Sequence, residues 1–204
     1  MRRLCPLALL VVFGSLLASA QAPAPMASGK SPEELIEDLW KKATEGEFLT
    51  AEGRNRYSGY FVRTSAPYEG KVVRVVSNRW GLLPTRTSNT TAQVAVEYTD
   101  EGTIDSELRY TPAPPSPFFK AAWMFHLALA PTYAVMYKSD GKVITGKEEK
   151  ETGLVAWQIS DPQGPPFTTT NTAIRYVLEM RKKSSNPAVR RNADETLSKL
   201  LRLD

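Results

Sequence analysis

The sequence predicts an α+β fold. A mixed or antiparallel sheet of five to six strands is expected to pack against an N-terminal helix and a central apolar helix, with a C-terminal helical pair after it. Apolar residues recur at helical spacing between residues 31 and 46 and again after residue 171, and β-branched or alternating runs lie between residues 71 and 110. The chain has 204 residues, 42% apolar and 24% charged, which excludes collagen, a disulfide-stapled mini-protein and a fully disordered chain.

The first twenty residues have the three parts of a secretory signal peptide. Two arginines follow Met1, residues 7–17 are an apolar stretch, and an Ala-Ser-Ala triplet offers small side chains before a cut after Ala20. We therefore expect residues 1–20 to be removed, which places the mature chain in the periplasm or outside the cell. A retained anchor helix is the alternative, although it needs a span of about 20 apolar residues.

Cysteine and charge narrow the function classes. The single cysteine, Cys5, lies in this leader and before its apolar run, so we expect neither lipidation nor any thiol in the mature chain. That excludes disulfides, cysteine-bound zinc and a cysteine nucleophile. The whole chain carries +4, and loss of the two leader arginines leaves +2. Residues 171–204 contain eight Lys or Arg and four Asp or Glu, so the positive charge is concentrated in this part of the chain. A local patch of this kind on an exported protein does not predict nucleic acid as the partner.

The first helix has clear start and stop signals. Residues 21–30 are rich in Pro, Ala, Ser and Gly and predict a flexible leader. Ser31 suits the N-cap, Pro32 suits the first helical position and Glu34 can close a capping box. One face is apolar up to Gly46, through Leu35, Ile36, Leu39, Trp40 and Ala43. Residues 48–62 are either a second short helix or an ordered loop.

Strands follow this helical part. Residues 71–79 and 92–99 are rich in β-branched side chains, and residues 103–110 alternate. The acidic glycine turn at residues 100–102 predicts a hairpin between the last two runs. The prolines of residues 111–117 should then end the ladder, because proline lacks the N–H donor.

The next segment predicts the central helix. Residues 118–130 are apolar nearly all round, too short for a membrane span, and bounded by Pro131. Three more strands are expected after it, over residues 133–137, 142–149 and 153–160, before a Pro/Gly break at 161–166.

Two helices are expected in the tail, separated by a break at residues 184–187. The apolar stripe of the second contains Val189, Ala193, Leu197, Leu200 and Leu201. Residues 31–165 are thus interpreted as the α+β domain and 166–204 as a C-terminal helical extension. We expect the extension to pack on the protein's own sheet, with a partner protein or an anionic membrane surface as alternatives.

Candidate chemistry is sparse. The sequence has no phosphate-binding loop, dinucleotide glycine motif, metalloprotease motif or serine-hydrolase motif, so it predicts no cofactor and no metal. His126, the single histidine, falls in the apolar segment and is interpreted as a packed core group rather than a catalyst. Glu97, Asp105 and Glu107 lie on adjacent expected strands. One of them in an apolar pocket would make a general base, but their alternation favours a solvated sheet face.

The aromatic residues of the predicted sheet and central helix have two possible interpretations. Trp123, Phe125, Tyr133 and Trp157 either line a ligand cavity between sheet and helix or form the core. We expect Trp40, Trp123 and Trp157 to be substantially buried, since each lies on an apolar stripe or at a strand centre.

The order of elements from Pro32 to Ser160 resembles the NTF2-like (SnoaL or ketosteroid-isomerase-like) superfamily. The resemblance implies a strongly curved sheet around a pocket, with helices covering it. In the enzymes of that superfamily a pocket acid and a Tyr-type donor transfer the proton, and no such pair is matched residue by residue here. The helical tail departs from the pattern, because those domains usually end on a strand.

The sequence therefore predicts an exported, non-catalytic module that binds a small apolar ligand or a protein of the cell envelope. The alternative is an NTF2-like isomerase or dehydratase with a pocket carboxylate as general base. Four groups decide between them: Glu97, Asp105, Glu107 and His126. One of them facing a closed apolar cavity would favour the enzyme, whereas exposure of all four favours binding.

Overall fold

The computed structural model describes residues 29–63, 72–114, 120–139, 144–160 and 166–203. The elements, in chain order, are α1 (Pro32–Thr44), η1 (Glu47–Leu49), α2 (Ala51–Arg56), η2 (Ser58–Tyr60), β1 (Val73–Leu82), β2 (Arg86–Thr87), β3 (Thr91–Ile104), β4 (Tyr110–Pro112), β5 (Ala121–Ser139), β6 (Ile144–Ile159), β7 (Phe167–Thr169), α3 (Thr170–Lys183) and α4 (Pro187–Leu200). The expected signal peptide and most of the flexible leader lie outside the described residues.

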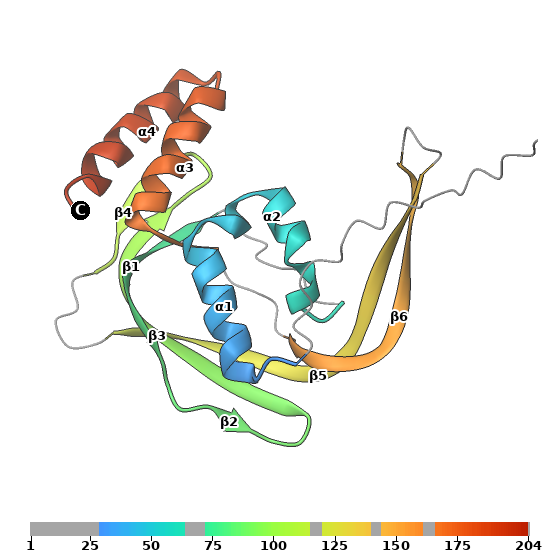
Figure 1. Cartoon of the computed structure of the whole chain (residues 1–204). Helices are drawn as coiled ribbons and strands as arrows, with labels where there is room; N and C mark the ends of the chain where they lie inside the picture. The colour runs from blue at the N-terminus through green and yellow to red at the C-terminus, as the bar shows by residue number, and fades with distance from the viewer. Residues whose placement is uncertain (1–28, 64–71, 115–119, 140–143, 161–165, 204) are drawn as a thin grey trace, which may run out of the picture.

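The predicted α+β class is confirmed. One strongly curled sheet has the strand order β6-β5-β3-β1-β7, with β2 and β4 also paired to β3 (Figure 1). The sheet is mixed, because β7 runs parallel to β1 while the β1–β3, β3–β5 and β5–β6 pairs are antiparallel. Helix α1 lies across the concave face, and α3 and α4 form a pair at the β1 end (Figure 1).

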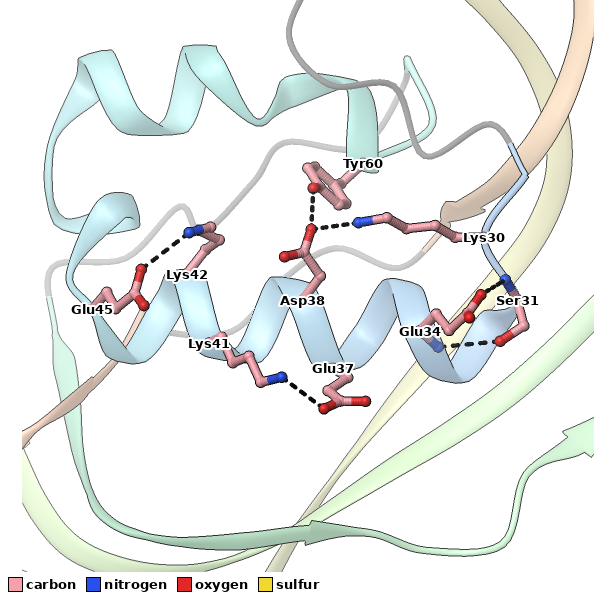
Figure 2. A network of polar contacts seen from close by, with 9 residues as sticks. All are labelled: Lys30, Ser31, Glu34, Glu37, Asp38, Lys41, Lys42, Glu45 and Tyr60. Carbon is pink, nitrogen blue, oxygen red and sulfur yellow. Dashed lines mark hydrogen bonds and ion pairs between the residues drawn. The ribbon is translucent and has the colours of Figure 1, made fainter.

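Helix α1 begins as the sequence predicts. The Ser31 hydroxyl accepts from the Glu34 N–H at 3.2 Å, and the Glu34 carboxylate accepts from the Ser31 N–H at 2.8 Å (Figure 2). This capping box satisfies two backbone donors that the first helical turn leaves unpaired. The helix ends before Gly46, whose φ of +93° lies in the left-handed region that glycine adopts without strain. Its apolar stripe is fully buried.

The ambiguous segment after α1 forms three short helical turns, η1, α2 and η2. Its end reaches the edge of the sheet, because Phe61 makes an isolated parallel bridge to Ile159 and the Val62 N–H donates to the Ile159 carbonyl at 2.9 Å. The end of this segment therefore hydrogen-bonds to the outer edge of β6 at Ile159.

The predicted hairpin at residues 100–102 is wrong. Strand β3 continues through these residues, and β1 opposes them with a register shift: Val75 pairs with Gly102 but Val76 pairs with Asp100. Glu101 is thus the extra residue of a β-bulge, so side chains beyond it change faces. The turn comes later, where the Asp105 carboxylate accepts from the Glu107 and Arg109 N–H groups, both at 2.9 Å.

The ladder ends at Pro112, the second residue of the segment in which we expected no pairing at all. Thr111 and Pro112 pair with β3 as part of the short strand β4. Strand β4 lies off the main strand path, a position in which the missing N–H of a proline is tolerated.

The prediction of a central helix over residues 118–130 is also wrong, because from Ala121 onward this segment is strand β5. Residues 118 and 119 lie outside the described residues. In the pairing with β3, residues of odd number face the core and residues of even number face away from it. The outward set is Ala122, Met124, His126 and Ala128. Three of these four are apolar, so the two-residue period of the strand disappears from the hydropathy pattern. Tertiary pairing with β3 and β6 decides the structure here.

The β5–β6 hairpin bends sharply midway. Pro131 pairs with Val155, but Tyr133 pairs with Glu151, so β6 has two extra residues at this point. Gly153, with a φ of +76°, lies within the insertion. The bulge explains why the outer part of the hairpin curls away from the rest of the sheet (Figure 1).

Two buried clusters stabilise the fold. The larger one lies between α1 and the concave face and is centred on Trp40, with Val94, Val96, Phe125 and Phe167 around it. The second joins the α3–α4 pair to the start of β1 and the end of β3, through Val75, Ile104, Val177, Ala193 and Leu200. The C-terminal helices therefore pack on the protein's own sheet, and residues 166–204 also supply its last strand, β7.

Candidate functional site

The four candidate catalytic groups lie at three separate places, all away from the buried core. Glu97 is on the outward face of β3 and forms an ion pair with Lys120 at 2.6 Å. Asp105 and Glu107 are in the turn before β4, where both carboxylates pair with Arg109. His126 is exposed on the outward face of β5, so its interpretation as a core histidine is wrong. None of these four described groups faces an enclosed apolar cavity.

The candidate pocket-lining aromatics divide into two pairs. Phe125 is fully buried, and Trp123 is partly buried with its ring 5.4 Å from that of Phe167, so both belong to the core. Trp157 and Tyr133 lie farther along the β5–β6 hairpin and are only partly buried. The expectation of substantial burial is confirmed for Trp40, while Trp123 and Trp157 are half-buried at the margin of the core.

An apolar surface lies on the inner face of the β5–β6 hairpin, beyond the part of the sheet that the N-terminal helices cover (the helical cover). On the inner face of the hairpin, the pair Leu127 and Ile159 is buried. The next pair on the same face, Leu129 and Trp157, is partly open, and the following pair, Pro131 and Val155, is exposed. Leu129 is 37% exposed and Val155 is 64% exposed. We call these four residues, Leu129, Pro131, Val155 and Trp157, the arm surface.

The side chain of Arg63 lies at the outer end of the arm surface. The Arg63 guanidinium, two residues after the Phe61 bridge, lies 5.2 Å from the centre of the Tyr133 ring. The same guanidinium pairs with the Glu149 carboxylate at 3.4 Å. These contacts connect the segment after η2 to the curled part of the hairpin, so the arm surface has the core on one side and this cluster on the other.

The arm surface offers contact area rather than reactive groups. It is made of one aromatic ring, two aliphatic side chains and a proline, none of which can exchange a proton or act as a nucleophile. Exposed apolar side chains gathered on one element are typical of a binding site. The arm surface is not evident from the sequence, because the apolar run before it predicts a helix that ends near residues 129–131. The alternation of Val155 and Trp157 with their neighbours was the available signal.

A part-buried carboxylate–tyrosine contact lies on the side of α1 that faces away from the sheet (Figure 2). The Asp38 carboxylate accepts hydrogen bonds from the Tyr60 hydroxyl and from the Lys30 ammonium group, the latter at 2.7 Å (Figure 2). Partial burial alone would raise the pKa of the Asp38 carboxyl, but the bonds from Lys30 and Tyr60 outweigh it and hold that pKa below its ordinary value. Burial, with the bond to Asp38, raises the pKa of Tyr60 far above its ordinary value. A carboxylate with a lowered pKa is a poor general base, so this contact connects α1 to η2 rather than moving protons.

We expect Asp38→Asn to lower the free energy of unfolding by about 1 kcal/mol at pH 7, since it removes a charged acceptor from two hydrogen bonds. Because the pKa of Asp38 is lowered on folding, its contribution is complete above its ordinary value of 3.8 and disappears as the pH falls through the folded value. Urea unfolding at pH 7 and at pH 3 measures this. The control is Glu37→Gln, which breaks the exposed ion pair with Lys41 on the same helix and should change little. Equal losses at both pH values would contradict the assignment.

Within the described ranges, no helix has both the length and the apolar content to span a membrane. The same residues contain no group of three or more His, Cys, Asp or Glu side chains arranged for a metal ion. Comparison with protein-family models, with curated proteins and with solved structures found no match to this chain.

Proposed function

We propose that the protein is a non-catalytic binding module that acts outside the cytoplasm and holds apolar groups on the arm surface. These groups belong to a small apolar ligand or to a protein of the cell envelope. The single observation that carries the proposal is that the core-facing side of the β5–β6 hairpin continues beyond its helical cover, from fully buried Ile159 to Val155 at 64% exposure. The proposed location outside the cytoplasm is supported by the signal-peptide pattern of residues 1–20.

The chemistry of the arm surface supports binding. Covering an exposed Leu or Val side chain stabilises a complex by up to about 1.5–3 kcal/mol, and the partly exposed Trp157 side chain adds a rigid aromatic ring. Arg63 and Glu149 neutralise each other at the border, so a ligand on the surface need not separate or desolvate an unpaired charge. The enzymatic alternative receives no such support, because Glu97, Asp105, Glu107 and His126 all lie elsewhere.

The test is an exposed charge placed on the arm surface. Val155→Asp should raise the Kd for the neutral fluorescent probe N-phenyl-1-naphthylamine by about tenfold, equivalent to about 1.4 kcal/mol, because binding would bury a carboxylate. Probe fluorescence measures the Kd, and circular dichroism checks that the fold is unchanged. Leu201→Asp is the matched control, since Leu201 is 62% exposed but lies at the end of α4. A probe Kd that Leu201→Asp raises and Val155→Asp does not would overturn the proposal.

A further inference from the structure

We propose a second binding site on the outward face of the sheet, for a small ligand that carries a phosphate group. The site is a row of three side chains, Arg86 on β2, Gln93 on β3 and His126 on β5. It lies on the face of β5 opposite the arm surface, since His126 alternates with Leu127 and Leu129 along the strand. The inference is therefore independent of the proposed function.

Strand register forms the row. Arg86 pairs with Gln93, and Gln93 pairs with His126. Directly paired residues of antiparallel strands point to the same face, so three neighbouring strands present these side chains side by side. Adjacent strands are about 4.8 Å apart, which makes the row about 10 Å long between the outer Cα atoms. All three residues are exposed.

The row lies in a hollow of about 430 Å³. This volume is within the range of about 300–1,000 Å³ typical of small-molecule sites. The hollow is lined by the row and by Thr87, Ser88, Thr91, Ala92, Leu127 and Ser160. On the face of the row it adds the hydroxyl groups of Ser88, Thr91 and Ser160 to a guanidinium, an amide and an imidazole, while Thr87, Ala92 and Leu127 alternate with the row along their strands. The described lining contains no carboxylate.

These donors match a phosphate group. A guanidinium binds phosphate oxygens through two parallel N–H bonds, and amide, hydroxyl and imidazole groups can donate to the remaining oxygens. Among the described residues of β2, β3 and β5, the acid on this face is Glu97, which lies four residues along β3 from Gln93, roughly 14 Å away at 3.4 Å per residue, and is paired with Lys120. Glu97 therefore neither neutralises Arg86 nor repels an anion strongly.

Backbone hydrogen bonds hold the lining in place. The Ser88 N–H donates to the Thr91 carbonyl at 2.8 Å, and the Ser88 and Thr91 hydroxyls lie 2.7 Å apart, which closes the β2–β3 turn. At the other end, the Ser160 N–H donates to the His126 carbonyl at 2.9 Å. A site whose backbone is already ordered loses less entropy when a ligand binds.

The single histidine makes the experiment direct. In the untagged mature protein, the ring signals of His126 are the sole histidine signals in the NMR spectrum. Glycerol 3-phosphate is titrated at constant ionic strength with sodium chloride as the competing salt. We expect a saturable shift of the His126 ring signals, and at least a tenfold higher Kd in Arg86→Gln. Arg191→Gln, an exposed arginine on α4, is the charge-matched control and should leave the Kd unchanged.

A second arm of the experiment separates the two sources of a phosphate group. Co-sedimentation with phosphatidylglycerol vesicles, compared with phosphatidylcholine vesicles, reports binding to a lipid headgroup. Arg86-dependent binding of glycerol 3-phosphate alone supports a soluble ligand, and Arg86-dependent binding of phosphatidylglycerol vesicles supports a lipid. A linear, unsaturated shift, or equal losses in Arg86→Gln and Arg191→Gln, would show general ionic attraction and overturn the site. The absence of Arg86-dependent binding in both arms would overturn it as well.

Discussion

Replacing Trp40 by alanine is expected to lower the free energy of unfolding by about 3–5 kcal/mol, the range for removing a large buried aromatic side chain. Trp40 is fully buried, and its ring centre lies 4.6 Å from that of Phe167 and 5.4 Å from that of Tyr98. Trp80 and Phe125 follow at 6.3 and 6.4 Å. These four rings come from β7, β3, β1 and β5, so one side chain of α1 connects the helix to four strands.

Two control variants, Trp40→Phe and Trp157→Ala, test whether the loss of stability comes from the packing of the Trp40 ring at the centre of the core. The Trp40 Nε1 is buried and has no hydrogen-bond partner among the described residues, so the substitution removes packing and none of the hydrogen bonds described. Trp40→Phe keeps most of the ring contacts and should be clearly less destabilising than Trp40→Ala. Trp157→Ala removes a tryptophan at the margin of the core and should be less destabilising, because part of its side chain is already exposed to solvent. Urea unfolding gives all three values, and a Trp40→Ala loss no larger than that of Trp157→Ala would contradict the central role of Trp40.

Thr196→Val is expected to lower the free energy of unfolding by about 2–4 kcal/mol although it preserves the shape of the side chain. The Thr196 hydroxyl accepts from the Tyr110 N–H at 3.0 Å and donates to the Leu108 carbonyl at 2.7 Å, all within a buried region. Valine would leave both backbone groups buried and unpaired, at about 1–3 kcal/mol each. The effect is large because these bonds connect α4 to the turn before β4, more than eighty positions earlier in the sequence.

Thr196→Ser is the matched control, because serine keeps the hydroxyl and loses one methyl group. We expect its stability to stay within about 1 kcal/mol of the parent protein. Thermal and urea unfolding compare the variants, and amide hydrogen exchange at Tyr110 reports the broken bond directly. If serine and valine destabilised the protein equally, the methyl packing and not the hydrogen bonds would connect α4 to the sheet.

Local signals in the sequence determined the three long helices, α1, α3 and α4. The capping box of Ser31 and Glu34 is a contact over three residues, and the stripe from Leu35 to Ala43 repeats within one helix. The break at Asn186 and Pro187 likewise separates α3 from α4, since Asn186 caps the second helix and Pro187 occupies its first turn. Such features depend on neighbours along the chain, and they could be predicted without knowing what the helices pack against.

The β-branched runs predicted parts of β1 and β3, but only the tertiary structure decided strand β5, the bulges and the register, and through them both proposed sites. Residues 121–130 are apolar on both faces, and only pairing with β3 and β6 makes them a strand. That pairing exposes His126, aligns it with Gln93 and Arg86, and carries Leu129 beyond the helical cover. At Glu101, one extra residue opposite β1 converts an expected turn into a bulge, where a Cβ on Gly102 would lie 2.3 Å from the Thr111 carbonyl oxygen. Register joins residues that are distant in sequence, and a one-residue slip moves every side chain to the opposite face, so hydropathy along one strand could not determine it.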